Sequence, residues 1–230
     1  MKSILLGLAA LAAAGPVSAA ERRITVTDYD RVQVEGPFTV TLATGKPNGA
    51  LVTGDGAALD RVSIDVQGRT LRVRANRSTW GGYPGEDPGP VTIALATHDL
   101  IGASVTGSGS LAIDKARAMR FELGVSGSGR IRLDSVETDI LILGLLGSGR
   151  ISIGGKTKSL RATIQGTGDL DAGALTAQDA NIQSDTSGTV TLAAAHSAAI
   201  VATGPGDVTV TGNPSCTIKM QGSGRVSCGR

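Results

Sequence analysis

The sequence has few aromatic residues and little net charge. It contains one Trp, two Tyr and two Phe among 230 residues, and its formal net charge is +2. So small a charge argues against nucleic acid or an anionic membrane surface as the partner. Because rings that stack on sugars are scarce, an extended aromatic sugar-binding groove is not expected. The two histidines, His98 and His196, have no nucleophile at a recognisable spacing, so the sequence predicts no catalytic constellation.

Cysteine is nearly absent as well. Cys216 and Cys228 both lie close to the C-terminus. Two soft ligands are too few for a structural metal site, so we expect no metal and no cofactor. In an oxidising compartment the pair predicts one structural disulfide that closes a short loop.

The N-terminus has the features of a secretory signal peptide. Lys2 precedes an apolar run over residues 4–14, and small residues at 17–20 precede the charged Glu21. This order predicts a signal peptide over residues 1–20 and export to the periplasm, the cell surface or the medium. No other run approaches the roughly 20 apolar residues of a membrane-spanning helix, so no integral membrane segment is expected in the mature protein. Residues 21–230 are predicted to form a single domain.

Glycine recurs with a regular period. The pattern Gly-x-Gly begins at successive spacings of 20, 20, 19, 20, 18 and 18 residues, if Thr186-Ser187-Gly188 is counted as a degenerate copy. The glycines of the intact copies are Gly107, Gly109, Gly127, Gly129, Gly147, Gly149, Gly166, Gly168, Gly204, Gly206, Gly222 and Gly224. A repeat of this length predicts a solenoid. Neither GxGxxG nor GxxxxGK[ST] occurs, so we interpret the glycines as bend residues rather than a phosphate-binding loop.

Apolar residues alternate on both sides of each glycine pair. Leu111 and Ile113 follow the first pair, and Leu123 and Val125 precede the second, with equivalents in every copy. A period of two indicates a strand with one buried face. Two strands per repeat predict an all-β fold, a parallel β-helix of about seven regular turns over residues 101–230. Both cysteines fall in the inward columns. Residues 21–100 also alternate and are expected to form less regular strands that cap the N-terminal end.

The segments "VQVEGPFTVTLATG" and "ALVTGDGAALDRVSIDVQGRTLRVRA", followed by serial Gly-Ser-Gly units, resemble the bacterial family of autotransporter adhesin head GIN domains. The likeness spans nearly the whole mature chain. It implies a right-handed parallel β-helix like that of pectin lyases, export to the envelope, no retained catalytic residues and a role in adhesion.

A polysaccharide lyase or hydrolase is the alternative, because parallel β-helices also carry such enzymes. Asp114 and Asp134 occupy the same position in adjacent turns, about one inter-strand spacing apart. That distance is close to the roughly 5 Å between the carboxylates of a retaining glycosidase. The competing interpretation is that both are solvated turn residues paired with Lys115 or Arg132.

Two features are candidates for binding. The outward residues Arg130 and Arg150, with Arg132 beside them, could hold an acidic group of a glycan or could form a solvated face. Trp80 and Tyr83 lie in a Gly/Pro-rich loop, where they could anchor a partner or plug the cap. The sequence therefore predicts a non-catalytic envelope or secreted β-helix that binds an unidentified protein or glycan, with a purely structural envelope protein as a further alternative.

Overall fold

The computed structural model describes residues 20–76 and 90–229, so all but the last residue of the predicted signal peptide lies outside them. Within these ranges sixteen strands form one sheet, accompanied by one short helix. The elements are β1 (Ala20–Ile24), β2 (Arg31–Glu35), β3 (Thr39–Thr44), β4 (Gly49–Gly54), α1 (Gly56–Leu59), β5 (Val62–Gln67), β6 (Thr70–Ala75), β7 (Thr92–Thr97), β8 (Gly102–Gly107), β9 (Ser110–Gly127), β10 (Arg130–Gly147), β11 (Arg150–Gly166), β12 (Asp169–Thr186), β13 (Val190–Ala202), β14 (Val208–Gly212), β15 (Ser215–Met220) and β16 (Val226–Cys228). The described part of the chain has no helix of the length and apolarity that crossing a membrane requires.

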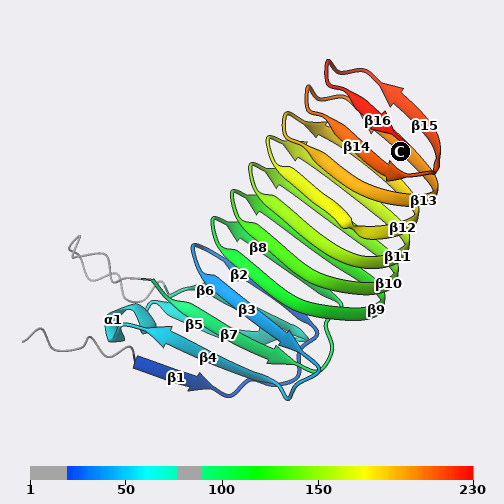
Figure 1. Ribbon diagram of the computed structural model, residues 1–230. Coiled ribbons are helices and arrows are strands. Elements are labelled where there is room, and N and C mark those ends of the chain that lie inside the picture. The colour runs from blue at the N-terminus through cyan, green and yellow to red at the C-terminus, as the bar shows by residue number, and fades with distance from the viewer. Residues whose placement is uncertain (1–19, 77–89, 230) are drawn as a thin grey trace, which may run out of the picture.

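The long strands stack as successive turns of a parallel β-solenoid (Figure 1). Arg130 lies opposite Arg150, and Arg150 lies opposite Asp169, as the regular spacing predicts. The solenoid has about six turns, whereas the sequence predicted about seven. The last Gly-x-Gly copy accounts for the difference, because it is followed only by the three-residue strand β16 and does not complete a turn.

Each complete turn has three sides, one more than the two strands predicted. In β9 the alternation of inward and outward residues is broken twice, where Asp114-Lys115 and Met119-Arg120 are outward in succession. The chain bends at these two points. We name the three sides by their residues in β9 and the equivalents in later turns: the front sheet (110–113), the bend side (115–119) and the back sheet (120–126).

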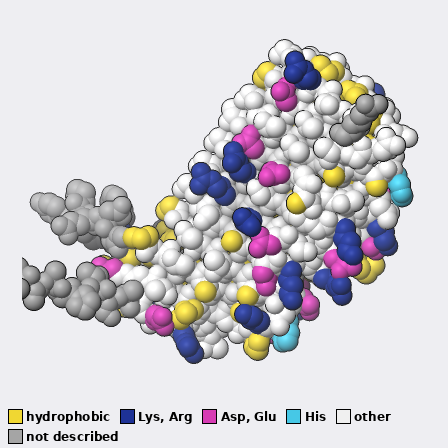
Figure 2. Space-filling view, in the orientation of Figure 1, with side chains coloured by type: hydrophobic (Ala, Val, Ile, Leu, Met, Phe, Trp, Pro, Cys, Tyr) yellow, Lys and Arg dark blue, Asp and Glu magenta, His cyan; other side chains and the backbone are white. Residues whose placement is uncertain are grey.

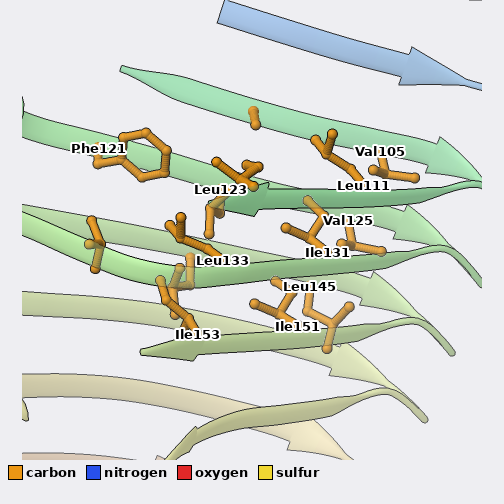
Figure 3. Close-up of a cluster of buried hydrophobic side chains, with 14 of the residues drawn as sticks. Val105, Leu111, Phe121, Leu123, Val125, Ile131, Leu133, Leu145, Ile151 and Ile153 are labelled. Atoms are coloured by element: carbon orange, nitrogen blue, oxygen red, sulfur yellow. The ribbon is translucent and has the colours of Figure 1, made fainter. Parts of the chain in front are cut away.

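The core lies inside these three sides. Side chains of the front and back sheets point toward one another, with Leu111 and Ile131 near Val125 (Figure 3). Phe121 is fully buried, at the end of the core that lies next to the bend side. The inward columns predicted from the alternation are confirmed as buried through the turn that ends at Ala202, because each of those turns is covered by another on both sides.

In the corners that begin at Gly107, Gly127, Gly147 and Gly166 the two glycines differ in backbone conformation. Gly127 has a φ of 114°, a left-handed conformation that L-residues with a side chain rarely adopt. Gly129 has no positive φ, but a Cβ there would lie 2.6 Å from Val105 Cγ1 and 2.8 Å from the carbonyl oxygen of Gly109. The first glycine permits the bend and the second permits the close stacking of turns. In the degenerate copy Thr186 is buried, and its hydroxyl donates to the carbonyl of Gly168 and accepts from the Gly188 N–H.

The N-terminal strands do form irregular first turns and hairpins, but they do not stack in chain order. Strand β3 lies between β7 and β9, and β2 lies between β6 and β8. Strands β2 and β3 therefore lie next to β8 and β9. Strands β6 and β7, which come later in the chain, lie on the other side of β2 and β3, farther from the long strands. Antiparallel pairing of β5 with β6, of β4 with β7 and of β1 with β4 then ends the parallel sheet. Gly68, at a φ of 63°, makes the tight turn between β5 and β6.

The two cysteines form the predicted disulfide, with their Cα atoms 6.6 Å apart. Cys216 lies opposite Ala198, so it does belong to an inward column. It is nevertheless exposed, and Ile218 and Met220 on the same strand are 43% and 48% exposed. The predicted inward register of Cys216 is confirmed. The residue is exposed because no later turn among the described residues covers the last turn.

Candidate interaction surface

The predicted arginine candidates lie together on the front sheet. Arg130 and Arg150 are neighbours on adjacent strands, and Arg132 is two residues along β10. Arg150 Nη2 is 2.6 Å from Asp169 Oδ2, and Arg132 Nε is 2.7 Å from Asp134 Oδ1. Within residues 20–76 and 90–229, Arg130 makes no ion pair. Two of the three guanidinium groups are thus already bound to carboxylates of the same face.

Trp80 and Tyr83, the aromatic binding candidates, lie outside the described residues.

The two carboxylates of the enzyme alternative stack as predicted, since their neighbours Ile113 and Leu133 are in register. Asp114 Oδ1 accepts hydrogen bonds from the backbone N–H of Thr44 at 3.0 Å and of Lys115 at 2.6 Å. Asp134 is held by Arg132. Asp114 thus fixes the backbone at the bend, and Asp134 forms an exposed ion pair with Arg132, which agrees with the interpretation as turn residues.

The bend side carries a groove that sequence reasoning missed. It has a volume of about 1040 Å³ and crosses five successive turns, from β9 to β13. One inward column on this side holds only small residues, Ala118, Thr138, Thr157 and Ala177. The buried hydroxyls of Thr138 and Thr157 donate to backbone carbonyls of their own bend, at 3.1 Å in each case. The backbone consequently lies close to the core, and longer outward side chains surround the hollow.

Charged side chains form two columns along this groove. The first runs Arg117, Glu137, Lys156 on β9, β10 and β11. Glu137 binds Arg117 on one side and Lys156, at 3.8 Å, on the other. In the second column Lys158 Nζ is 2.8 Å from Asp139 Oδ1. Figure 2 shows basic and acidic side chains gathered on the side where the long strands bend.

The charged side chains of the bend side form ion pairs but remain exposed to solvent. Arg117 chiefly, and Lys156 to a smaller extent, hold the pKa of the Glu137 carboxyl below its usual value. The cations stay accessible, since the side chains of Arg117, Lys156 and Lys158 are 82%, 72% and 66% exposed. Ion pairs this exposed contribute little to folding. Their donors therefore remain available to a ligand.

A signal for these columns was present in the sequence. Glu137 follows Arg117 by 20 residues and Lys156 follows Glu137 by 19, the same spacings as the glycine pairs. Apolar alternation marks only the strands that flank each glycine pair, so the charged residues in the middle of the repeat were not predicted. His196 also lines the groove, at its β13 end. Among the described residues there is no cluster of three metal-ligating side chains.

Comparison with known proteins agrees with this architecture. The family described as "Putative auto-transporter adhesin, head GIN domain" matches residues 28–214. The chain belongs to this family. The match extends from the first turn at β2 to the start of the last one, so the family's defining region is the solenoid and its cap. A search of curated proteins gave no match.

Solved structures share the fold of this head GIN domain. One, described as a "putative adhesin" from Bacteroides fragilis, has 18% identity and a TM-score of 0.83 over 92% of this chain and 97% of its own. A "putative lipid binding protein" from Parabacteroides distasonis has 24% identity and a TM-score of 0.68 over 93% and 97%. A "putative adhesin" from the same organism has 20% identity and a TM-score of 0.69 over 91% and 96%. At these identities the likeness shows the fold alone.

Proposed function

We propose that this protein is a non-catalytic interaction module of the cell envelope or its exterior, which binds an extended protein or glycan along the axis of the solenoid. The observation that carries the proposal is the groove of about 1040 Å³ that crosses five turns of the bend side. A groove across parallel strands is long and shallow, and its lining repeats with the turn spacing of about 4.8 Å. Such a surface suits a linear partner better than a compact small molecule.

Three further observations support the proposal. The family and two of the similar structures carry the description adhesin. The N-terminal sequence predicts export, which would place the module where an adhesive partner is found. Of the carboxylates on which an enzyme would depend, Asp114 accepts backbone hydrogen bonds at the bend and Asp134 is paired with Arg132.

The front sheet is the second candidate for the contact surface. Its favourable feature is Arg130, which is exposed and has no ion-pair partner in the described ranges. Arg130 could bind an acidic group together with Arg150, whose bond to Asp169 would then be shared.

Binding to arrays of bacterial and host glycans and of envelope proteins tests the proposal. The variant Thr176→Trp places a bulky ring in the groove, where Thr176 is exposed on β12. Thr191→Trp is the matched control on the front sheet, and Arg130→Ala/Arg150→Ala tests the arginines directly. We expect Thr176→Trp to abolish a binding signal that Thr191→Trp preserves.

Other outcomes would change the assignment. Loss of binding only in Arg130→Ala/Arg150→Ala would move the contact surface to the front sheet. Product formation on a bound glycan would favour the enzyme alternative. No binding to any member of the arrays would leave a structural role in the envelope as the better account.

A further inference from the structure

The charges in the groove are arranged in bands, each band on one turn. Arg117 on β9 is basic, Glu137 and Asp139 on β10 are acidic, and Lys156 and Lys158 on β11 are basic. The two basic bands are two turns apart, which is roughly 10 Å at the usual inter-strand spacing. The acidic band lies between them: Glu137 is paired to both basic bands, and Asp139 is paired to Lys158.

This arrangement leaves the basic bands, not the acidic one, open to the acidic groups of a ligand. Glu137 is bound from two sides and its pKa is depressed, so it is ionised and would repel a second carboxylate. A guanidinium group has five N–H donors and an ammonium group has three, so Arg117, Lys156 and Lys158 each keep donors after pairing. With three cations and two carboxylates, the groove section from β9 to β11 has a net positive charge.

We infer that the groove binds a linear acidic polysaccharide that carries its carboxylate or sulfate groups on alternate sugars. One acidic group would be bound by Arg117 and the next by Lys156 and Lys158. The intervening neutral sugar would lie over the acidic band, where hydroxyl groups can donate to Glu137 and Asp139. Farther along the axis Thr176, Gln178 and His196 line the same groove and offer polar contacts to the rest of the chain.

The acidic band also provides selectivity. A polymer with a charge on every sugar would place a carboxylate against Glu137 or Asp139, and like charges in contact are repelled. This inference rests on the proposed function, since it names the class of partner that the groove would accept.

The test is binding of the protein to hyaluronan, whose carboxylates occur on alternate sugars, to polygalacturonate, which has one on every sugar, and to neutral dextran. We expect hyaluronan to bind, polygalacturonate to bind more weakly and dextran not to bind. Added salt should weaken binding to hyaluronan because it screens exposed charges. Lys156→Glu/Lys158→Glu should lower affinity for hyaluronan by at least about tenfold.

Two further variants keep the result interpretable. Lys219→Glu/Arg225→Glu makes the same change in net charge at exposed positions of the last turn, outside both candidate surfaces, and should leave affinity for hyaluronan within about twofold. Glu137→Gln removes one of the two charges of the acidic band. The affinity for polygalacturonate should therefore rise toward the affinity for hyaluronan. Circular dichroism verifies that each variant is folded, which we expect because all the altered side chains are exposed.

Several results would overturn the inference. Equal loss in the two charge-reversal variants would show attraction by overall charge rather than by the groove. Equal binding of dextran and hyaluronan would remove the role of the carboxylates. If hyaluronan fails to bind while Thr176→Trp still abolishes binding of some other partner, the acidic-glycan inference is wrong but the proposed function stands. If hyaluronan does not bind and Thr176→Trp abolishes binding of no other partner, both the acidic-glycan inference and the proposed function are wrong.

Discussion

Arg150 and Asp169 lie opposite each other on adjacent turns of the front sheet, with Nη2 and Oδ2 2.6 Å apart. The other carboxylate oxygen, Oδ1, accepts a hydrogen bond of 2.9 Å from the backbone N–H of Thr189 on the following turn. One aspartate thereby connects three successive turns. The backbone hydrogen bond is the larger cause, and Arg150 the smaller, of a pKa of Asp169 below its usual value.

We predict a stability that depends on pH through Asp169. Because its pKa is lower in the folded state than in the unfolded chain, the unfolded state binds more protons between the two values. The contribution is therefore complete above the unfolded pKa of about 3.9 and is lost as pH falls through the folded value. Measured by denaturant, the free energy of unfolding should fall less between pH 7 and pH 2 in Asp169→Asn than in the wild type. A carboxyl that titrates at its ordinary pKa by NMR would contradict this.

We predict that the same titration separates the two partners of Asp169. In Arg150→Ala the pKa of Asp169 should rise, yet it should stay below the ordinary value because the Thr189 N–H still donates. In Arg132→Ala it should not change, since Arg132 is bound to Asp134 instead. A complete return to the ordinary value in Arg150→Ala would show that the ion pair, rather than the backbone, dominates.

We predict that Gly149→Ala is strongly destabilising although it adds a single methyl group. That group would lie 2.5 Å from the carbonyl oxygen of Gly129 and 2.6 Å from Val125 Cγ1, and the turns would have to separate locally. Overpacking of this kind costs about 1–3 kcal/mol. Gly173→Ala is the matched control, because the nearest atom to its Cβ would be Thr191 Cγ2 at an ordinary 3.5 Å. Equal melting temperatures in the two variants would contradict the stacked-corner explanation.

We predict that truncation of the core is costly and truncation of the groove wall is not. Leu141 is fully buried on the back sheet, whereas Met119 is 82% exposed beside the groove. Leu141→Ala should lower the free energy of unfolding by about 2–5 kcal/mol. Met119→Ala should change it by no more than about 0.5 kcal/mol. Denaturant titration of both variants measures the difference, and similar losses would place Met119 in the core.

We predict that the disulfide stabilises mainly the last turn. Cys216→Ala/Cys228→Ala should cost about 2–3 kcal/mol for a cross-link spanning 12 residues. In a solenoid each turn contacts only its neighbours, so the loss should remain local. Hydrogen exchange should accelerate in β15 and β16 and stay slow in β9 to β11. Uniform acceleration through all turns would instead show that the whole solenoid unfolds as one unit.

The sequence by itself determined the architecture of the repeats. Glycine pairs every 18–20 residues and apolar alternation beside them predicted a parallel solenoid, its inward columns and the stacking of Asp114 on Asp134. These features are predictable because a repeat brings equivalent residues into register, so a column is visible as a spacing. Alternation in residues 21–100 also predicted the less regular N-terminal strands.

The tertiary structure alone decided where the turns bend, how the first turns cross and which surface is hollow. Two outward residues in succession, as at Asp114-Lys115, are weak signals, so the third side and its groove were not predicted. The order of β2, β3, β6 and β7 depends on pairing between distant segments, which alternation does not encode. Ion-pair partners such as Arg117 and Glu137 likewise meet only because folding places them one turn apart.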